Sequence, residues 1–191
     1  MEYAAVAVVF AAVAAIVLVG HLVTATGNSG APINQVVTPF SRNYRVVPTV
    51  NTGGYSSGKI VGGVQTINPA TGVSFSALLE SICLKNLANT TPAFTIYFFD
   101  TTPTGSYTDG ASLSWASAAQ AADFGKIIHT HTVATGDWIA AGSQATADYG
   151  AIGKQLVLTG QALSFIIAAT GSFTCGTTAD LTLDFNLLQE G

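Results

Sequence analysis

The chain has 191 residues, of which 8% are charged and 49% are hydrophobic, and its formal net charge is −4. Typical soluble domains contain about 25% charged residues, so we expect other subunits or lipid to cover much of this surface. Nucleic-acid binding is not expected, because neutralising phosphates requires clustered basic residues and the six Lys and Arg are dispersed. The length suggests one domain with an extension.

The N-terminal segment has the composition of a hydrophobic helix. No Asp, Glu, Lys or Arg occurs between Tyr3 and Ser41, and apolar residues dominate 3–23. About 20 apolar helical residues span roughly 30 Å, the thickness of a bilayer core. We therefore expect one hydrophobic α-helix within residues 1–26 that acts as an assembly or membrane anchor. Its expected contact residues are Tyr3, Val6, Val9, Phe10, Val13, Ile16, Val17, Val19 and Leu22.

Three interpretations of this segment compete. A cleaved signal peptide would have a basic start and a shorter apolar core. A conventional membrane anchor would have Lys or Arg at one flank, whereas the first basic residue here is Arg42. The third is a helix that is apolar on all sides because protein, lipid or both surround it, with alanines that allow close helix packing. We favour the third, and a membrane contact through residues 3–23 stays open.

Residues 27–44 are predicted to be an extended linker arm. Pro32, Pro39 and two glycines in this range prevent a long helix or a central strand. The scattered apolar residues suggest that the arm lies against another surface.

Residues 45–191 alternate short apolar runs with turn residues, which predicts an all-β domain. The clearest strand is Leu181–Leu188, where apolar side chains alternate with Thr182, Asp184 and Asn186. We expect a single antiparallel β-sandwich or jelly-roll-like domain. Its predicted strands are Arg45–Val50, Lys59–Ile67, Val73–Lys85, Phe94–Phe99, Lys126–Val133, Lys154–Leu158, Ala162–Ala169 and Leu181–Leu188. Its predicted core residues are Phe94, Ile96, Phe98, Phe165, Ile167, Leu181, Leu183, Phe185 and Leu187.

The stretch Phe94–Trp115 begins as an aromatic and β-branched strand and then changes abruptly to turn residues. Asp, Pro and Gly favour turns for different steric and hydrogen-bonding reasons. The strand is therefore expected to lead into a long, polar, structured loop at the end of the domain. A short helix is predicted after it, at Ser117–Phe124, with Ser117 as the N-cap.

Two candidate ligand sites deserve consideration. His129 and His131 are two residues apart in a predicted strand and share one face. Such a pair can begin a metal site, but no third ligand is evident, so we expect solvent-facing or interface histidines. Asp100 and Asp109 would be able to hold a cation across the loop, although Asx-turns are favoured. We expect no metal, no cofactor and no catalysis, because no nucleophile elbow, P-loop or dinucleotide motif occurs.

The remaining candidate residues have structural interpretations. Cys83 and Cys175 do not form a CxxC motif, and two inert buried thiols are favoured over a disulfide. Four aspartates lie beside Gly, Ala or a turn and are interpreted as caps or solvated loop residues: Asp123, Asp137, Asp148 and Asp180. Four aromatic residues are interpreted as core or subunit contacts rather than a sugar platform: Tyr97, Trp115, Trp138 and Phe165.

Four segments occur in order along the chain: Val46–Gly63 (VVPTVNTGGYSSGKIVGG), Tyr97–Thr104 (YFFDTTPT), Thr108–Leu113 (TDGASL) and Thr178–Leu183 (TADLTL). Together they resemble the opening, a turn, the following segment and the last strand of a family of tailed-phage virion structural proteins. Lys59 stands where that family has an acidic residue, and Gly110 where it has Asn. The resemblance covers residues 46–191 and implies a capsid-associated or decoration-type β-sandwich without catalysis.

Three functional hypotheses follow. The favoured one is a virion structural protein, a capsid shell, decoration or spike subunit of a bacteriophage, whose partners are its own copies and other virion proteins. It would assemble through the N-terminal helix and the β-sandwich surface. The alternative is a pilin-like filament subunit at the cell surface, with the hydrophobic helix in the filament core. A membrane-anchored adhesin or hydrolase is the third, and the lack of a catalytic set disfavours its enzymatic version.

Overall fold

The computed structural model describes residues 25–26, 32–33, 39–68 and 75–190. The chain divides into two compact units, Met1–Thr38 and Pro39–Gly191. In the first unit, β1 (Ala25–Thr26) pairs antiparallel with β2 (Pro32–Ile33). The predicted helix over residues 3–23 and its anchor side chains lie outside the described residues. Within the described ranges, no helix is long and apolar enough to cross a membrane.

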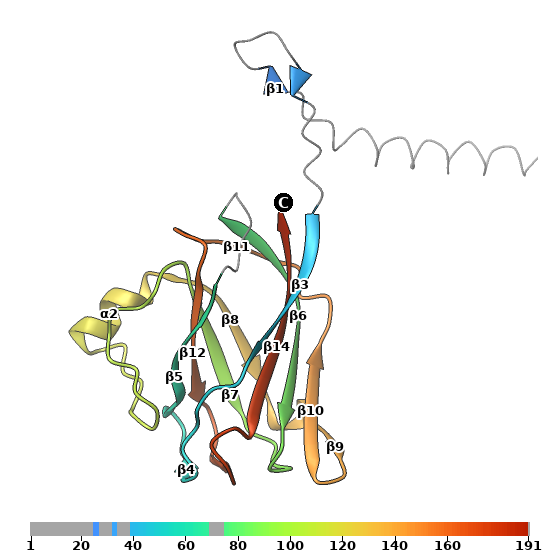
Figure 1. Cartoon of the computed structure of the whole chain (residues 1–191). Helices are drawn as coiled ribbons and strands as arrows, with labels where there is room; N and C mark the ends of the chain where they lie inside the picture. The colour runs from blue at the N-terminus through green and yellow to red at the C-terminus, as the bar shows by residue number, and fades with distance from the viewer. Residues whose placement is uncertain (1–24, 27–31, 34–38, 69–74, 191) are drawn as a thin grey trace, which may run out of the picture. The chain divides into compact units, whose positions relative to one another are not determined.

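The second unit contains two antiparallel sheets (Figure 1). The first sheet has the order β3-β14-β6-β10-β9, and β11 also pairs with β6. Because β11 pairs with the first half of β6 and β10 with the second half, these two strands together line one edge of β6, and β9 lies beyond β10. The bounds are β3 Pro39–Val46, β6 Ser76–Asn86, β9 Ile139–Ala141, β10 Gln144–Tyr149, β11 Lys154–Val157 and β14 Leu181–Glu190.

The second sheet has the order β5-β12-β7-β8. Its bounds are β5 Ile60–Ile67, β7 Phe94–Phe99, β8 Ile127–Val133 and β12 Leu163–Ala169. A small separate pair joins β4 (Gly54–Tyr55) to β13 (Phe173–Thr174). Two short helices follow β7 and β8: α2 (Ala118–Phe124) and the 3₁₀ turn η1 (Thr135–Asp137).

The two sheets pack face to face as a sandwich over one apolar core. Phe185 of the first sheet contacts Phe165 and Phe98 of the second, with ring centroids 5.0 and 5.9 Å apart. The nine predicted core residues are all buried in this cluster, which confirms the assigned strand faces. All seven residues of β12 are buried, as expected for a central strand with both faces covered.

The chain passes repeatedly from one sheet to the other. Taken in chain order, with β10 and β11 as one, the principal strands are β3, β5, β6, β7, β8, β10–β11, β12 and β14. The first sheet then has the order 1-8-3-6 and the second the order 2-7-4-5. The first and last strands are therefore neighbours, and the ends of the sandwich domain meet in one sheet.

A second, smaller apolar cluster lies on the outer face of the second sheet. It consists of Ile60, Phe99, Ile166 and Tyr107, with Leu113 and Trp115 packed against it. Residues 100–126, which we call the β7–β8 loop, supply Tyr107, Leu113 and Trp115 and include α2 (Figure 1). The predicted long, structured loop is thus confirmed, but it packs apolar side chains against the outer face of the second sheet and does not lie at the end of the domain as predicted.

The strand β5 is an edge strand with an irregular middle. Its register with β12 shifts between Phe165 and Ile167. Gly62 and Gly63 have φ values of +74° and +75°, which favour glycine because it has no Cβ. The start of β5 is bonded to the β7–β8 loop, since Ile60 N–H donates to Ala111 and Gly110 N–H donates to Ile60, both at 2.8 Å.

Some predicted boundaries were wrong. The strand predicted at Arg45–Val50 is β3, which begins at Pro39 and ends at Val46, so it occupies part of the predicted linker 27–44. The strands β9 and β10 were not predicted. The helix is confirmed at Ala118–Phe124 with Ser117 at its N-cap position, but the Ser117 hydroxyl donates to Ser114 instead of capping the helix.

Candidate functional site

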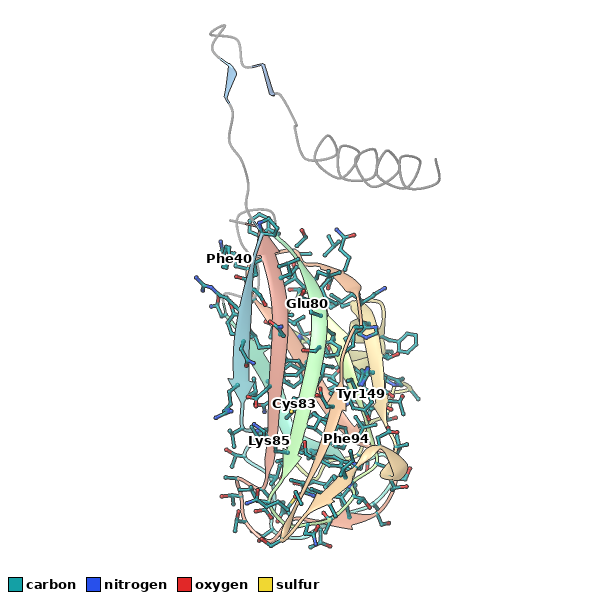
Figure 2. The ribbon with its side chains drawn as sticks, turned by 90° about the vertical axis from the view of Figure 1, so that its right-hand side faces the viewer. Phe40, Glu80, Cys83, Lys85, Phe94 and Tyr149 are labelled. Carbon is teal, nitrogen blue, oxygen red and sulfur yellow. The ribbon has the colours of Figure 1, made fainter. Side chains whose placement is uncertain are left out.

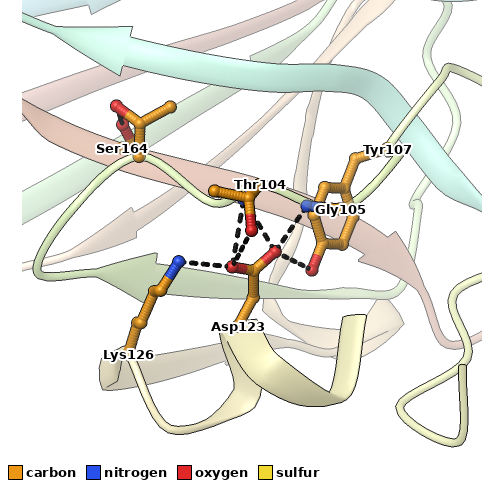
Figure 3. Close-up of polar contacts among 7 residues, drawn as sticks. Thr104, Gly105, Tyr107, Asp123, Lys126 and Ser164 are labelled. Carbon is orange, nitrogen blue, oxygen red and sulfur yellow. Dashed lines mark hydrogen bonds and ion pairs between the residues drawn. The ribbon is translucent and has the colours of Figure 1, made fainter. Parts of the chain in front are cut away.

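Asp123 is the centre of the best-connected polar cluster in the β7–β8 loop, and its surface is 0% exposed. Its carboxylate accepts from the backbone N–H groups of Thr104 (2.9 Å) and Gly105 (2.7 Å), and from the Thr104 hydroxyl (3.2 Å) (Figure 3). The Tyr107 hydroxyl donates at 3.1 Å and Lys126 Nζ at 2.7 Å. The prediction of a cap or a solvated loop residue was therefore wrong for Asp123.

The charge of Asp123 is fixed by its neighbours. Burial opposes ionisation, but hydrogen bonds from Lys126, Thr104 and Gly105 outweigh it and hold the pKa of the Asp123 carboxyl below its ordinary value. Burial, together with the hydrogen bond to Asp123, raises the pKa of the Tyr107 hydroxyl. A carboxylate that already accepts this many hydrogen bonds has little capacity to accept more from a ligand. The cluster therefore stabilises the loop.

Gln120 provides a second attachment on the same face of α2, three residues before Asp123. Its Oε1 accepts from Ser114 N–H at 2.6 Å, and its Nε2 donates to the Ser106 carbonyl at 2.9 Å. Gly105 lies between these side chains, because a Cβ there would stand 3.0 Å from the Tyr107 ring and 3.1 Å from Gln120 Cγ. The short helix therefore fixes both halves of the loop.

The two aspartates proposed as a cation pair have separate environments. Asp109 Oδ1 accepts from the Tyr55 hydroxyl at 2.7 Å and from Gly62 N–H at 2.6 Å. Asp100 lines a polar hollow of about 280 Å³ with Thr101, Thr102, Thr159 and Gln161, and its enclosed Oδ1 has no hydrogen-bond partner among the described residues. Among the described residues, no group of three or more His, Cys, Asp or Glu is arranged to hold a metal ion.

A row of aromatic side chains lies beside the loop on the second sheet. Tyr97 meets Trp115 edge-to-face at 5.4 Å, and Trp115 meets Phe124 edge-to-face at 5.3 Å. Phe124, next to the buried Asp123, is 57% exposed. Trp138 and Phe165 lie in the core, as predicted. We did not single out Phe124 from the sequence, although it directly follows Asp123 in the predicted helix.

A second apolar feature lies at one end of the first sheet. A hollow of about 220 Å³ is lined there by Pro39, Ala77, Leu78 and Leu188, among others. Phe75 and Val157 next to it are 45% and 61% exposed. Exposed aromatic and aliphatic side chains of this kind favour contact with another molecule.

The outer face of the first sheet is polar along β6 (Figure 2), where Glu80, Cys83 and Lys85 lie. Asp184 on β14 accepts from Arg45 at 2.7 Å and from Lys85 at 2.9 Å, and these bonds hold the pKa of its carboxyl low. Cys83 and Cys175 are free thiols; Cys175 is buried as predicted, whereas Cys83 is only partly buried. Burial raises the pKa of the Cys175 thiol to about 11, so this thiol is unreactive near neutral pH.

His129 and His131 share one face of β8, as predicted, but they are not solvent-facing. They lie opposite the core residues Phe98 and Ile96 of β7. Asp137 caps η1 as predicted, because it accepts from Ala134 N–H at 2.8 Å. Asp180 accepts from Thr177 N–H at 2.8 Å in the turn before β14 and is 3% exposed, so it is a buried turn residue and neither a helix cap nor a solvated loop residue.

Comparison with known proteins shows distant likenesses. No family model and no curated protein matches the chain. A sugar-binding protein, the EclA C-terminal domain, is 11% identical with a TM-score of 0.25, and 87% of each chain is covered. The VP2 subviral particle of infectious bursal disease virus is 13% identical with a TM-score of 0.32; the match covers 88% of this chain but 38% of that one. Turnip yellow mosaic virus is 12% identical with a TM-score of 0.30, and 89% of each chain is covered.

Proposed function

We propose that the chain is a virion structural protein of a bacteriophage and acts as a shell, decoration or spike subunit without catalysis. The strand order is the main support. An order of 1-8-3-6 facing 2-7-4-5 is that of a jelly roll, in which successive strands alternate between two sheets except at strands 4 and 5, and jelly rolls are common in viral capsid and lectin domains. Because one fold serves many functions, the strand order alone does not identify a virion protein. The segments that resemble virion proteins and the low charge of the chain supply the further support.

The surface of the sandwich domain supports the same proposal. Exposed large apolar side chains lie in several places, among them Phe124 on α2, Ile139 on β9 and Val157 on β11. A subunit surrounded by other subunits covers such side chains on assembly. We propose that the aromatic row of Tyr97, Trp115 and Phe124 is one contact surface and that the N-terminal segment, residues 1–26, is another.

The direct test is composition of the purified phage particle. Mass spectrometry calibrated with labelled peptides is expected to find the chain in many copies per particle. Its absence from particles would overturn the proposal. Electron micrographs of the purified assembly separate the alternatives, because filaments would favour the pilin-like function.

The contact surfaces are tested by incorporation of variants. Phe124→Ser is expected to reduce the copy number in particles while the melting temperature of the free protein changes little, since the side chain is exposed. Ala122→Ser, at another exposed position of the same helix, is the matched control and is expected to incorporate normally. Deletion of residues 1–26 is expected to give a β domain that no longer incorporates stably. Full incorporation of that deletion would show that the sandwich surface is sufficient.

A further inference from the structure

His129 and His131 lie where the two sheets of the sandwich approach each other at one side. The His129 ring stacks on Phe98, with centroids 5.6 Å apart and an interplanar angle of 19°. The His131 ring meets Tyr149 of β10, in the opposite sheet, edge-on at 4.3 Å. The strand β8 also contacts β11, the neighbour of β10 along the same edge. We call His129, His131 and Tyr149 the histidine seam.

The two imidazoles have no polar partner at one nitrogen each. Nε2 of His129 and Nε2 of His131 are enclosed and lack a hydrogen-bond partner in the described part of the chain. The ring centroids are 6.4 Å apart, so two charged rings would repel each other. An unpaired buried charge costs far more than an unpaired neutral group. The site therefore accommodates two neutral imidazoles better than two imidazolium ions.

The charged groups that face the seam come from β11 and η1. Lys154 on β11 opposes protonation of His129, whereas Asp137 in η1 favours protonation of His131. Asp137 already accepts hydrogen bonds from the Tyr149 hydroxyl at 2.6 Å and from Ala134 N–H. Part of its capacity to accept hydrogen bonds is therefore used. Ile96 and Phe98 of β7 are apolar. Burial is the largest influence on both rings and lowers the pKa of both histidines.

We propose that the histidine seam is an acid-sensitive contact: the sandwich closes along β8 with both imidazoles neutral, and their protonation separates β8 from β10 and β11 before the rest of the domain unfolds. This is independent of the proposed virion function, because it rests on the contacts of one sandwich domain. It gives the domain a pH-dependent opening on the side opposite β3 and β5.

The sign of the pH dependence follows from proton uptake. In the opened chain the histidines bind protons with their ordinary pKa of 6.5, whereas in the closed chain the pKa is lower. The opened state therefore binds more protons as the pH falls below 6.5, so the stability present above that value is lost on acidification. The pKa values of Asp123, Asp137, Asp180 and Asp184 are lowered from the ordinary value of 3.8, so the range between about pH 5 and 7 isolates the histidines.

The test uses the full chain and a double variant, His129→Gln with His131→Gln. The matched control is His21→Gln, which removes the remaining histidine of the chain. From about pH 7.5 to about pH 5, the wild type and the control are expected to lose several degrees of melting temperature, and amide exchange in β8 and β10 is expected to speed up beyond the intrinsic pH effect. The double variant is expected to change little in either measurement. An equal loss in the double variant would overturn the proposal.

A second measurement does not need the double variant to fold. NMR titration of the imidazole protons in the wild type is expected to give midpoints below 6.5 for His129 and His131, the ordinary value. Midpoints at or above that value would contradict the proposal. Added Zn²⁺ gives a further decisive outcome: a rise in melting temperature that the double variant lacks would identify a metal-binding pair instead of an acid-sensitive contact.

Discussion

The Asp123 cluster and the histidine seam contain ionisable side chains whose surroundings favour opposite charge states: Asp123 is buried, and His129 and His131 are half-buried. Asp123 has donors on all sides and keeps its charge. His129 and His131 have aromatic rings beside them and no partner at Nε2 among the described residues, so their surroundings favour the neutral imidazole. The difference comes from the neighbours: a loop can turn its backbone N–H groups toward a side chain, whereas the N–H groups of a β-ladder are already paired. Burial alone therefore does not determine whether a side chain is charged.

The largest expected effect is that of removing the Asp123 charge. Asp123→Asn keeps the shape but leaves Lys126 without its partner and places an amide group against N–H donors. Breaking a buried ion pair on one side costs about 3–5 kcal/mol. Urea denaturation of the variant is expected to show a loss of about this size, and an unchanged midpoint would mean that the cluster does not stabilise the loop.

The dependence of the melting temperature on pH, measured below neutral pH, distinguishes the Asp123 cluster from the histidine seam. The pKa of Asp123 is lowered, so its contribution is complete above its ordinary value of 3.8 and is lost as the pH falls further. The wild-type melting temperature is thus expected to fall in two steps, the first from the histidines and the second from the carboxylates. Asp123→Asn is expected to flatten the second step and leave the first intact. A single step would contradict the assignment.

A smaller loss is expected at Gly105, which lies against the Asp123 cluster. Gly105→Ala would place a Cβ 3.0 Å from the Tyr107 ring and 3.2 Å from Asp123 Oδ2. Overpacking of this kind costs about 1–3 kcal/mol. The control is Gly125→Ala at the C-cap of α2, where a Cβ would meet nothing within 4 Å. Thermal melts that shift equally for the two variants would show that the packing around Gly105 is adaptable.

The smallest effect is expected at Asp184, whose partners are largely in water. The Arg45 side chain is 63% exposed and that of Lys85 is 45% exposed, although Asp184 itself is 7% exposed. Arg45→Gln is expected to cost at most about 1 kcal/mol, because exposed ion pairs are screened and Lys85 remains. Repeating the melt in high salt should shrink the difference further, whereas a salt-independent loss would indicate a packing role for Arg45.

The sandwich was predictable because its strands follow simple patterns. Leu181–Leu188 alternates by residue, and the central strand β12 is apolar except for Ser164. By contrast, β10 was missed because its inward residues other than Tyr149 are Ala145 and Ala147, which are 2% and 1% exposed but too small to mark a hydrophobic face. Pro39 correctly indicated that β3 is not a central strand, yet it did not prevent an edge strand from starting there.

The polar sites were less predictable, because their neighbours are distant in sequence. Asp123 is buried by Thr104 and Gly105, 19 and 18 residues earlier. Spacing placed His129 and His131 on one face, but it did not say which face of β8 is covered by the opposite sheet. A strand pattern predicts which side chains share a face, but which of the two faces is covered depends on where the opposite sheet packs.

The irregular middle of β5 has a consequence for a protein at high local concentration. An exposed edge strand presents unpaired backbone groups on which another chain can form a continuous sheet, the route to amyloid-like aggregation. At the start of β5, the backbone N–H and carbonyl of Ile60 are already bonded to Ala111 and Gly110 of the β7–β8 loop. The two glycines at positive φ then interrupt the extended conformation of the strand. These two features make the first half of this edge a poor template for strand pairing with another chain.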